Sequence, residues 1–131
     1  MRSVDTNVLV RALVRDDPVQ AARAEALIGQ HDIFIPITVI LELEWVLRSR
    51  YGYAPKRVAQ ALEKITALGN VVVAERDAVL AATARVQQGW DFADALHHAL
   101  SQGCDDFVTL DVDLYRRASR ATKVAPAITK L

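Results

Sequence analysis

The chain has little of what defines several protein classes. It contains one cysteine, Cys104, among 131 residues, so no internal disulfide bond can form. We therefore expect a reducing compartment, the cytoplasm, and we expect Cys104 to be a small buried apolar residue. The 16 Lys and Arg residues balance the 16 Asp and Glu residues. Net charge therefore gives no indication of a nucleic-acid partner, and any such attraction must be local.

Long hydrophobic runs are also missing. No stretch reaches the ~18 consecutive apolar residues that a membrane-spanning helix needs. Asp5 interrupts the N-terminus before the apolar core of a signal peptide can form, so we expect neither a targeting segment nor a membrane partner. Hydrophobic residues make up 52% of the chain and charged residues 24%, which indicates a globular protein. We expect residues 1–131 to form a single domain.

Short apolar segments alternate with amphipathic ones along the chain. The predicted strands are 2–4, 33–36, 71–73 and 107–110, with a possible edge strand near Val124. The predicted helices are 8–13, 18–28, 38–49, 55–68, 77–89, 91–103 and 112–120. We expect Thr38 to cap its helix, and strand 71–73 to be fully buried because it does not alternate. The order predicts an α/β fold, a three-layer α/β/α sandwich with a short, mainly parallel sheet of four or five strands.

Four acidic residues stand where a metal site would need them. Asp5 and Asp111 each follow a predicted strand, while Glu42 and Asp94 lie near the starts of predicted helices. Ligands bind at the carboxyl ends of strands in such sheets, so we predict that the four converge on one edge. Carboxylates that converge repel each other unless a hard cation such as Mg²⁺ or Mn²⁺ holds them. The set therefore predicts a metal site for phosphate chemistry.

Other interpretations of single acids are available. Asp5 and Asp111 are common turn or N-cap residues. An exposed Glu42 fits less well, because its helix is apolar nearly all round. Glu44 lies two residues further on and therefore on a different face, and we assign it to solvent, an interface or a basic partner. Asp91 suits the N-cap of its helix, or the rim of the site.

Three more polar residues lie close to these acids in the sequence. Asp113 is interpreted as a solvated helix residue, with a fifth acid near the metal as the alternative. His97 and His98 follow Asp94 at spacings that share a helix face, but a transition-metal site would need more imidazoles. We expect surface or packing roles for both histidines.

Four segments together resemble the motifs of PIN-domain ribonucleases. They are 5–7 (Asp-Thr-Asn), 42–48 (Glu-Leu-Glu-Trp-Val-Leu-Arg), 91–96 (Asp-Phe-Ala-Asp-Ala-Leu) and 109–111 (Thr-Leu-Asp). Each is weak alone, but their order, their spacing and the chain length are similar to those of the VapC group. That group is the toxin half of bacterial type II toxin–antitoxin pairs. The resemblance runs from Val4 to about Arg117.

This resemblance implies a PIN-like α/β/α sandwich that cleaves RNA with Mg²⁺ or Mn²⁺, forms a homodimer and is inhibited by a cognate antitoxin. By position, Asp5 and Asp94 match the best-defined metal ligands, Glu42 matches the second acid and Asp111 the fourth. Thr6 and Asn7 match residues that support the first acid, and Thr109 is a supporting residue in the fourth motif. The chemistry implied is attack of a metal-activated water on the scissile phosphate. Thr6 or Asn7 would hydrogen-bond Asp5 or that phosphate.

Basic and apolar residues outside the motifs also suggest contacts. Basic residues gather at Arg116, Arg117, Arg120, Lys123 and Lys130, and again at Arg48, Arg50, Lys56 and Arg57 beside Tyr51 and Tyr53. Basic groups with aromatic rings suit RNA backbone contact and base stacking, although solvated helix faces are an equally good interpretation. The apolar helix segment 39–47, with Trp45, exceeds what one core needs. Its surplus suits a dimer or antitoxin surface.

Three other classes of protein share some of these features. A receiver-type phosphotransfer domain would need adjacent acids after the first strand and a lysine after a late strand. In this chain Asp5 stands alone, and segment 107–110 is followed by Asp111. A dehalogenase-type phosphatase would need Asp-x-Asp, but 5–7 supplies asparagine in the third place. A non-catalytic PIN-like binding module is the remaining alternative, and the intact set of acids argues against it.

Overall fold

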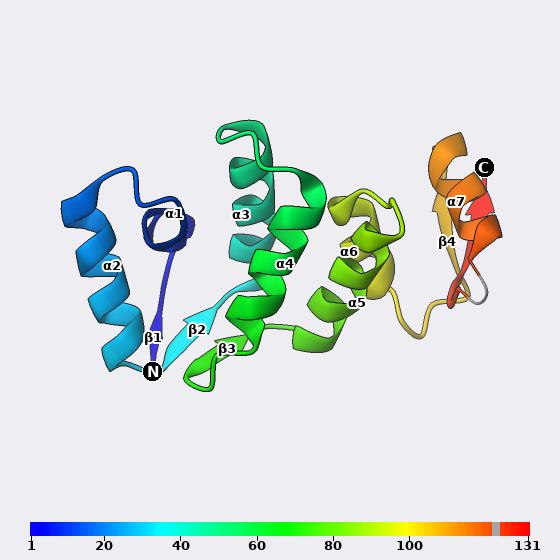
Figure 1. The fold of residues 1–131 in the computed structure, drawn as a ribbon. Helices are drawn as coiled ribbons and strands as arrows, with labels where there is room; N and C mark the ends of the chain where they lie inside the picture. The colour runs from blue at the N-terminus through cyan, green and yellow to red at the C-terminus, as the bar shows by residue number, and fades with distance from the viewer. Residues whose placement is uncertain (122–123) are drawn as a thin grey trace. The chain divides into compact units, whose positions relative to one another are not determined.

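The computed structural model describes residues 1–121 and 124–131. Over these residues the chain forms seven helices and five short strands (Figure 1). It divides into two compact units, Met1–Arg76 and Asp77–Leu131. Lys123 of the predicted basic cluster lies outside the described residues.

The first unit holds a parallel three-stranded sheet. Its elements are β1 (Arg2–Ser3), α1 (Thr6–Val14), α2 (Pro18–Gln30), β2 (Ile33–Ile35), α3 (Ile37–Ser49), α4 (Pro55–Thr66) and β3 (Val71–Val73). The strand order is β1-β2-β3, with Ile33 opposite both Arg2 and Val71. Helix α1 packs against α2 and α3, and α3 packs against α4. The carboxyl end of β1 therefore leads straight into a helix that is packed on two sides.

Branched aliphatic side chains form the core of this unit. The largest fully buried ones are Ile33, Ile35, Ile40, Leu43, Leu47, Leu62, Val10 and Val58. In β3, however, Val72 is 47% exposed while Val71 and Val73 are buried. The prediction of a fully buried strand is therefore wrong. Alternate residues of a strand point to opposite faces, and in the described structure β3 is an edge strand with one face open.

The second unit combines three helices with two parallel strands. Its elements are α5 (Arg76–Gln87), α6 (Phe92–Ala99), β4 (Asp106–Thr109), α7 (Val112–Arg120) and β5 (Ala127–Lys130). Strand β4 pairs with β5, and α7 packs against both. His98 is buried, and its Nε2 lies 2.8 Å from the carbonyl oxygen of Pro126. His98 therefore has the packing role that the sequence predicts, while His97 is exposed.

The predicted α/β class with parallel strands is confirmed, and the five strands lie in two sheets of three and two. Two local expectations are wrong, and a third element, the predicted edge strand, is present but shifted along the chain. Helix α3 begins at Ile37, with Pro36 in the N-cap position and no side-chain cap, so Thr38 lies inside the first turn and cannot cap the helix. The last strand begins after Pro126 rather than near Val124, since proline cannot donate to a strand ladder. Cys104 is exposed, because α6 ends at Ala99 and leaves it in a surface turn.

Nothing in the described part of the chain resembles a membrane-spanning helix in both length and apolar character.

Candidate metal centre

Asp5 occupies the junction between β1 and α1. Its backbone is extended, and its side chain caps α1 by accepting a hydrogen bond from the N–H of Val8 at 3.3 Å. The cap uses one carboxylate oxygen, and the side chain is exposed. The capping role and a ligand role are therefore compatible, because the second oxygen remains accessible. Asn7, in the first turn of α1, is also exposed.

Thr6 connects the first acidic motif to the second. Its hydroxyl donates a hydrogen bond to Oε1 of Glu42, which lies 36 residues away on α3. Thr6 is 5% exposed, whereas the Glu42 side chain is exposed. The structure thus gives Thr6 a different partner from the one the sequence suggested, Asp5. It also corrects the expectation that Glu42 would not be exposed. A buried hydroxyl that holds an exposed carboxylate orients that carboxylate.

We expect Thr6→Val to reduce the RNA cleavage that the PIN resemblance implies by about tenfold, because loss of a group that orients a metal-site carboxylate typically has an effect of this size. Valine keeps the shape of threonine but cannot donate to Glu42. Thr6→Ser keeps the hydroxyl and is expected to cleave close to the wild-type rate. Steady-state cleavage with matched melting curves measures both. Equal rates for the Val and Ser variants would show that Thr6 does not orient Glu42.

Glu44 has a different environment from Glu42, although both lie on α3. Glu44 is 4% exposed, and its Oε2 accepts a hydrogen bond from Nε of Arg48 at 3.1 Å. Of the assignments made from the sequence, the basic partner is confirmed and solvent is wrong. The expectation that the two glutamates lie on different helix faces is confirmed. Glu42 is therefore the acid of this pair that is available to a ligand.

Two aspartates of the second unit cap helices beside the site. The side chain of Asp91 accepts from the N–H of Asp94 at 3.1 Å, which confirms Asp91 as the N-cap of α6. Asp111 caps α7 by accepting from the N–H groups of Asp113 and Leu114 at 2.9 and 3.1 Å. The hydroxyl of Thr109 in turn accepts from the N–H of Asp111 at 3.0 Å. Thr109 therefore fixes the backbone that carries Asp111.

The electrostatics of Asp94 show that these carboxylates lie within reach of one another. Partial burial raises the pKa of Asp94, and the negative charges of Asp91 and Asp111 raise it further. The positive charges of His97 and Arg117 act in the opposite direction. Neighbouring negative charges make it costly to ionise such a carboxylate. A bound cation would neutralise these carboxylates and remove that cost. Oxygen donors of this kind fit a hard ion such as Mg²⁺.

The predicted acids are divided between the units, with Asp5 and Glu42 in the first and Asp94 and Asp111 in the second. Within each unit, over the described residues, no three or more His, Cys, Asp or Glu side chains form a group able to hold a metal ion. The structure brings Thr6 to Glu42, and places Asp111 near Asp94. The grouping of all four acids remains a prediction.

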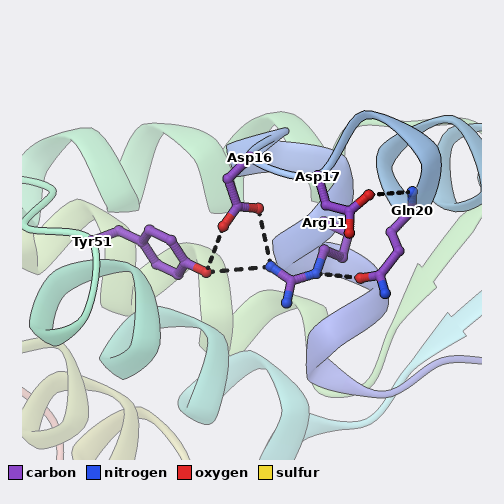
Figure 2. A network of polar contacts seen from close by, with 5 residues as sticks. All are labelled: Arg11, Asp16, Asp17, Gln20 and Tyr51. Atoms are coloured by element: carbon purple, nitrogen blue, oxygen red, sulfur yellow. Dashed lines mark hydrogen bonds and ion pairs between the residues drawn. The ribbon is translucent and has the colours of Figure 1, made fainter.

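A polar network that the sequence did not indicate lies on α1, close to Asp5. Nη1 of Arg11 donates to Asp16 at 3.0 Å and to the hydroxyl of Tyr51 at 3.4 Å, and its Nε donates to Gln20 at 2.6 Å (Figure 2). The hydrogen bond with Tyr51 and the charge of Asp16 raise the pKa of Arg11. Tyr51 lies 40 residues from Arg11 in the chain. No local pattern could have paired them.

A model of the PIN domain family matches residues 3–120, which span both units. The chain therefore belongs to the PIN domain family. PIN domains are in general nucleases that depend on divalent metal ions such as Mg²⁺ and bind RNA. In a sequence comparison, no curated protein matches the chain.

Proposed function

We propose that this PIN domain is a metal-dependent endoribonuclease of the VapC type, the toxin of a type II toxin–antitoxin pair. The observation that carries the proposal is the match to the PIN domain family over residues 3–120. It is supported by Asp94, whose pKa is raised first by partial burial and further by the negative charges of Asp91 and Asp111. Such an arrangement is costly without a cation and favourable with one. The order of the four acidic motifs supports the VapC assignment.

The four acids share one role in the proposed mechanism, and nearby polar residues support them. Asp5, Glu42, Asp94 and Asp111 would hold Mg²⁺ or Mn²⁺. When bound, the ion lowers the pKa of a water molecule and stabilises the charge that develops on the scissile phosphate. Thr6 orients Glu42, and Thr109 fixes the backbone of Asp111. Asn7 is exposed beside Asp5, and in this proposal it donates a hydrogen bond to an RNA phosphate.

A cavity in the second unit supports RNA as the substrate. It has a volume of about 680 Å³, and its lining includes Arg85, Arg117, Arg120 and Trp90. The guanidinium of Arg85 lies 5.1 Å from the centre of the Trp90 ring. The positive charge of Arg117 lowers the pKa of Asp94. Because Arg117 lines the cavity, the cavity lies near that acid. Positive charge beside an acidic site allows a phosphate backbone to approach carboxylates that would otherwise repel it.

The surface of α3 supports the proposed protein partners, a second copy of this chain and a cognate antitoxin. Trp45 is 50% exposed, and the guanidinium of Arg50 lies 6.0 Å from the centre of its ring. Tryptophan and arginine are enriched where proteins bind one another. We place both partners, together with the RNA, in the cytoplasm.

Metal binding tests the proposal without reference to catalysis. We expect Mn²⁺ to bind the wild-type protein in a calorimetric titration and to bind Asp5→Ala at least about tenfold more weakly, because one carboxylate ligand is lost. Asp32→Ala is the matched control, since Asp32 is an exposed acid of the same unit outside the motifs. Equal Mn²⁺ affinity for the wild type and Asp5→Ala would remove Asp5 from the site.

A further inference from the structure

A pocket lies between α1 and α2 in the first unit, directly beside Asp5. Its volume is about 280 Å³, and Val8, Ala24 and Leu27 form the apolar part of its lining. The polar part consists of Asp5, Asn7, Arg11, Gln20 and Arg23. Asp5 therefore belongs both to the proposed metal site and to this pocket. A group held here is next to the bond that is cut.

The polar groups of the pocket are mainly hydrogen-bond donors. Arg23 is exposed, and among the residues that the structure describes its guanidinium has no ion pair or hydrogen-bond partner. The oxygen of the Gln20 side chain already accepts from Arg11, so its amide NH₂ is the group left for a ligand (Figure 2). Asp16 and Tyr51 hold Arg11 in place and offset much of its charge. Arg23 therefore supplies the positive charge of the pocket that is not offset by an ion pair.

These features select the kind of ligand. The volume is slightly below that of pockets that enclose a drug-sized molecule, so one planar base fits and a folded peptide does not. Apolar walls disfavour a bare phosphate, which would lose its hydration without full compensation. A guanidinium fork matches two adjacent acceptors, and guanine presents such a pair in O6 and N7. Unpaired RNA bases are commonly bound against apolar and guanidinium surfaces in this way.

We propose that the α1–α2 pocket binds one guanine base of the RNA, next to the cleaved bond, and that Arg23 reads this base. The inference rests on the proposed ribonuclease function. It assigns the sequence preference of the enzyme to residues of the first unit, none of which lines the basic cavity of the second unit. Arg23 acts as a specificity residue and takes no part in the chemical step.

A library of RNAs randomised around the cut site tests this directly. The wild type is expected to prefer guanine at one position, and Arg23→Ala to reduce that preference by roughly 5- to 100-fold, the usual range for losing a bidentate base contact. Arg23→Lys keeps the positive charge but lacks the two parallel N–H donors of the guanidinium, so it should also lose the preference for guanine. Lys64→Ala, which removes an exposed charge of α4 outside the pocket, should keep it. An unchanged profile in both Arg23 variants would overturn the inference.

Direct binding separates failure of this inference from failure of the proposed function. In an NMR titration of Asp94→Asn protein, GMP should shift the signals of α1 and α2 more than AMP, CMP, UMP or inorganic phosphate, and Arg23→Ala should abolish the difference. If the wild type cuts no RNA, the ribonuclease proposal fails, while this titration still decides what the pocket binds. Equal shifts with all nucleotides, or shifts with phosphate alone, would contradict guanine binding.

Discussion

Replacing Asp94 by asparagine is expected to reduce metal-dependent RNA cleavage by more than about 100-fold while the protein stays folded. Loss of a group that only orients a ligand already lowers activity by about 10- to 100-fold, and Asp94 is proposed to be a ligand itself. Asparagine has nearly the shape of aspartate and keeps its place in the first turn of α6. The measurement is the cleavage rate in Mg²⁺ or Mn²⁺. Asp105→Asn, an exposed acid in a turn of the same unit, is the matched control.

The same substitution has an expected effect on stability that gives a second readout. The pKa of Asp94 is raised in the folded protein, so ionisation there costs free energy that the unfolded chain does not lose. This cost is absent below the ordinary carboxyl pKa of about 3.9, grows as the pH rises from there to the raised value, and is fully present above it. Without metal at neutral pH, Asp94→Asn should therefore melt at a higher temperature than the wild type, and the difference should vanish in acid.

Added Mg²⁺ should reverse this order, because the wild type alone gains stability from binding the ion. A folded Asp94→Asn variant that cuts RNA at the wild-type rate would remove Asp94 from the metal site. A wild type that melts higher than the variant without metal at neutral pH would contradict the electrostatic account.

Arg48→Ala is expected to lower the free energy of unfolding by about 2–3 kcal/mol. Removing one partner of a fully buried ion pair costs roughly 3–5 kcal/mol, because the other charge is left buried and alone. The Glu44 side chain is 5% exposed but that of Arg48 is 36% exposed. Water therefore screens the arginine end of the pair, and the expected loss is smaller than for a fully buried pair. Urea unfolding followed by circular dichroism gives the value, since the slope of that transition reports whether unfolding stays cooperative.

Two companion variants decide whether burial is the cause. The double substitution Glu44→Met with Arg48→Met removes both charges, and should recover most of the loss, since apolar pairs of similar volume often replace buried ion pairs without cost. Arg15→Ala breaks an ion pair with Glu25 whose side chains are 63% and 41% exposed. That change should cost less than about 1 kcal/mol. If Arg15→Ala and Arg48→Ala lower the free energy of unfolding by similar amounts, burial of Glu44 is not the cause of the loss in Arg48→Ala.

Helix starts could be predicted closely because their signals are local. Asp17 before Pro18, and Asp91 and Asp111 before their helices, act through hydrogen bonds to N–H groups two or three residues away. The acids of the candidate site are predicted from local signals of the same kind. At Asp5, for example, the first motif begins where the first predicted strand ends. Here the sequence contains both the donor and the acceptor within one turn.

Burial and long-range pairing could not be predicted in this way. The sequence of its helix leaves solvent, an interface and a basic partner open for Glu44, because nothing in that helix shows which face packs inward. The bond from Thr6 to Glu42 spans 36 residues, and so depends on how α1 packs against α3. The pocket beside Asp5 likewise exists only because α2 packs against α1. Such contacts arise from tertiary packing, which periodicity and capping do not encode.

The most direct test of the central claim is cleavage of total RNA by purified, antitoxin-free protein in Mg²⁺, in Mn²⁺ and in EDTA, beside Asp94→Asn. We predict cuts at discrete sites with either metal ion, and none with EDTA or with the variant. The absence of any cleavage by well-folded wild-type protein, or cleavage that continues in EDTA, would contradict the metal-dependent ribonuclease account. In the first case a PIN domain that only binds its partner becomes the better explanation.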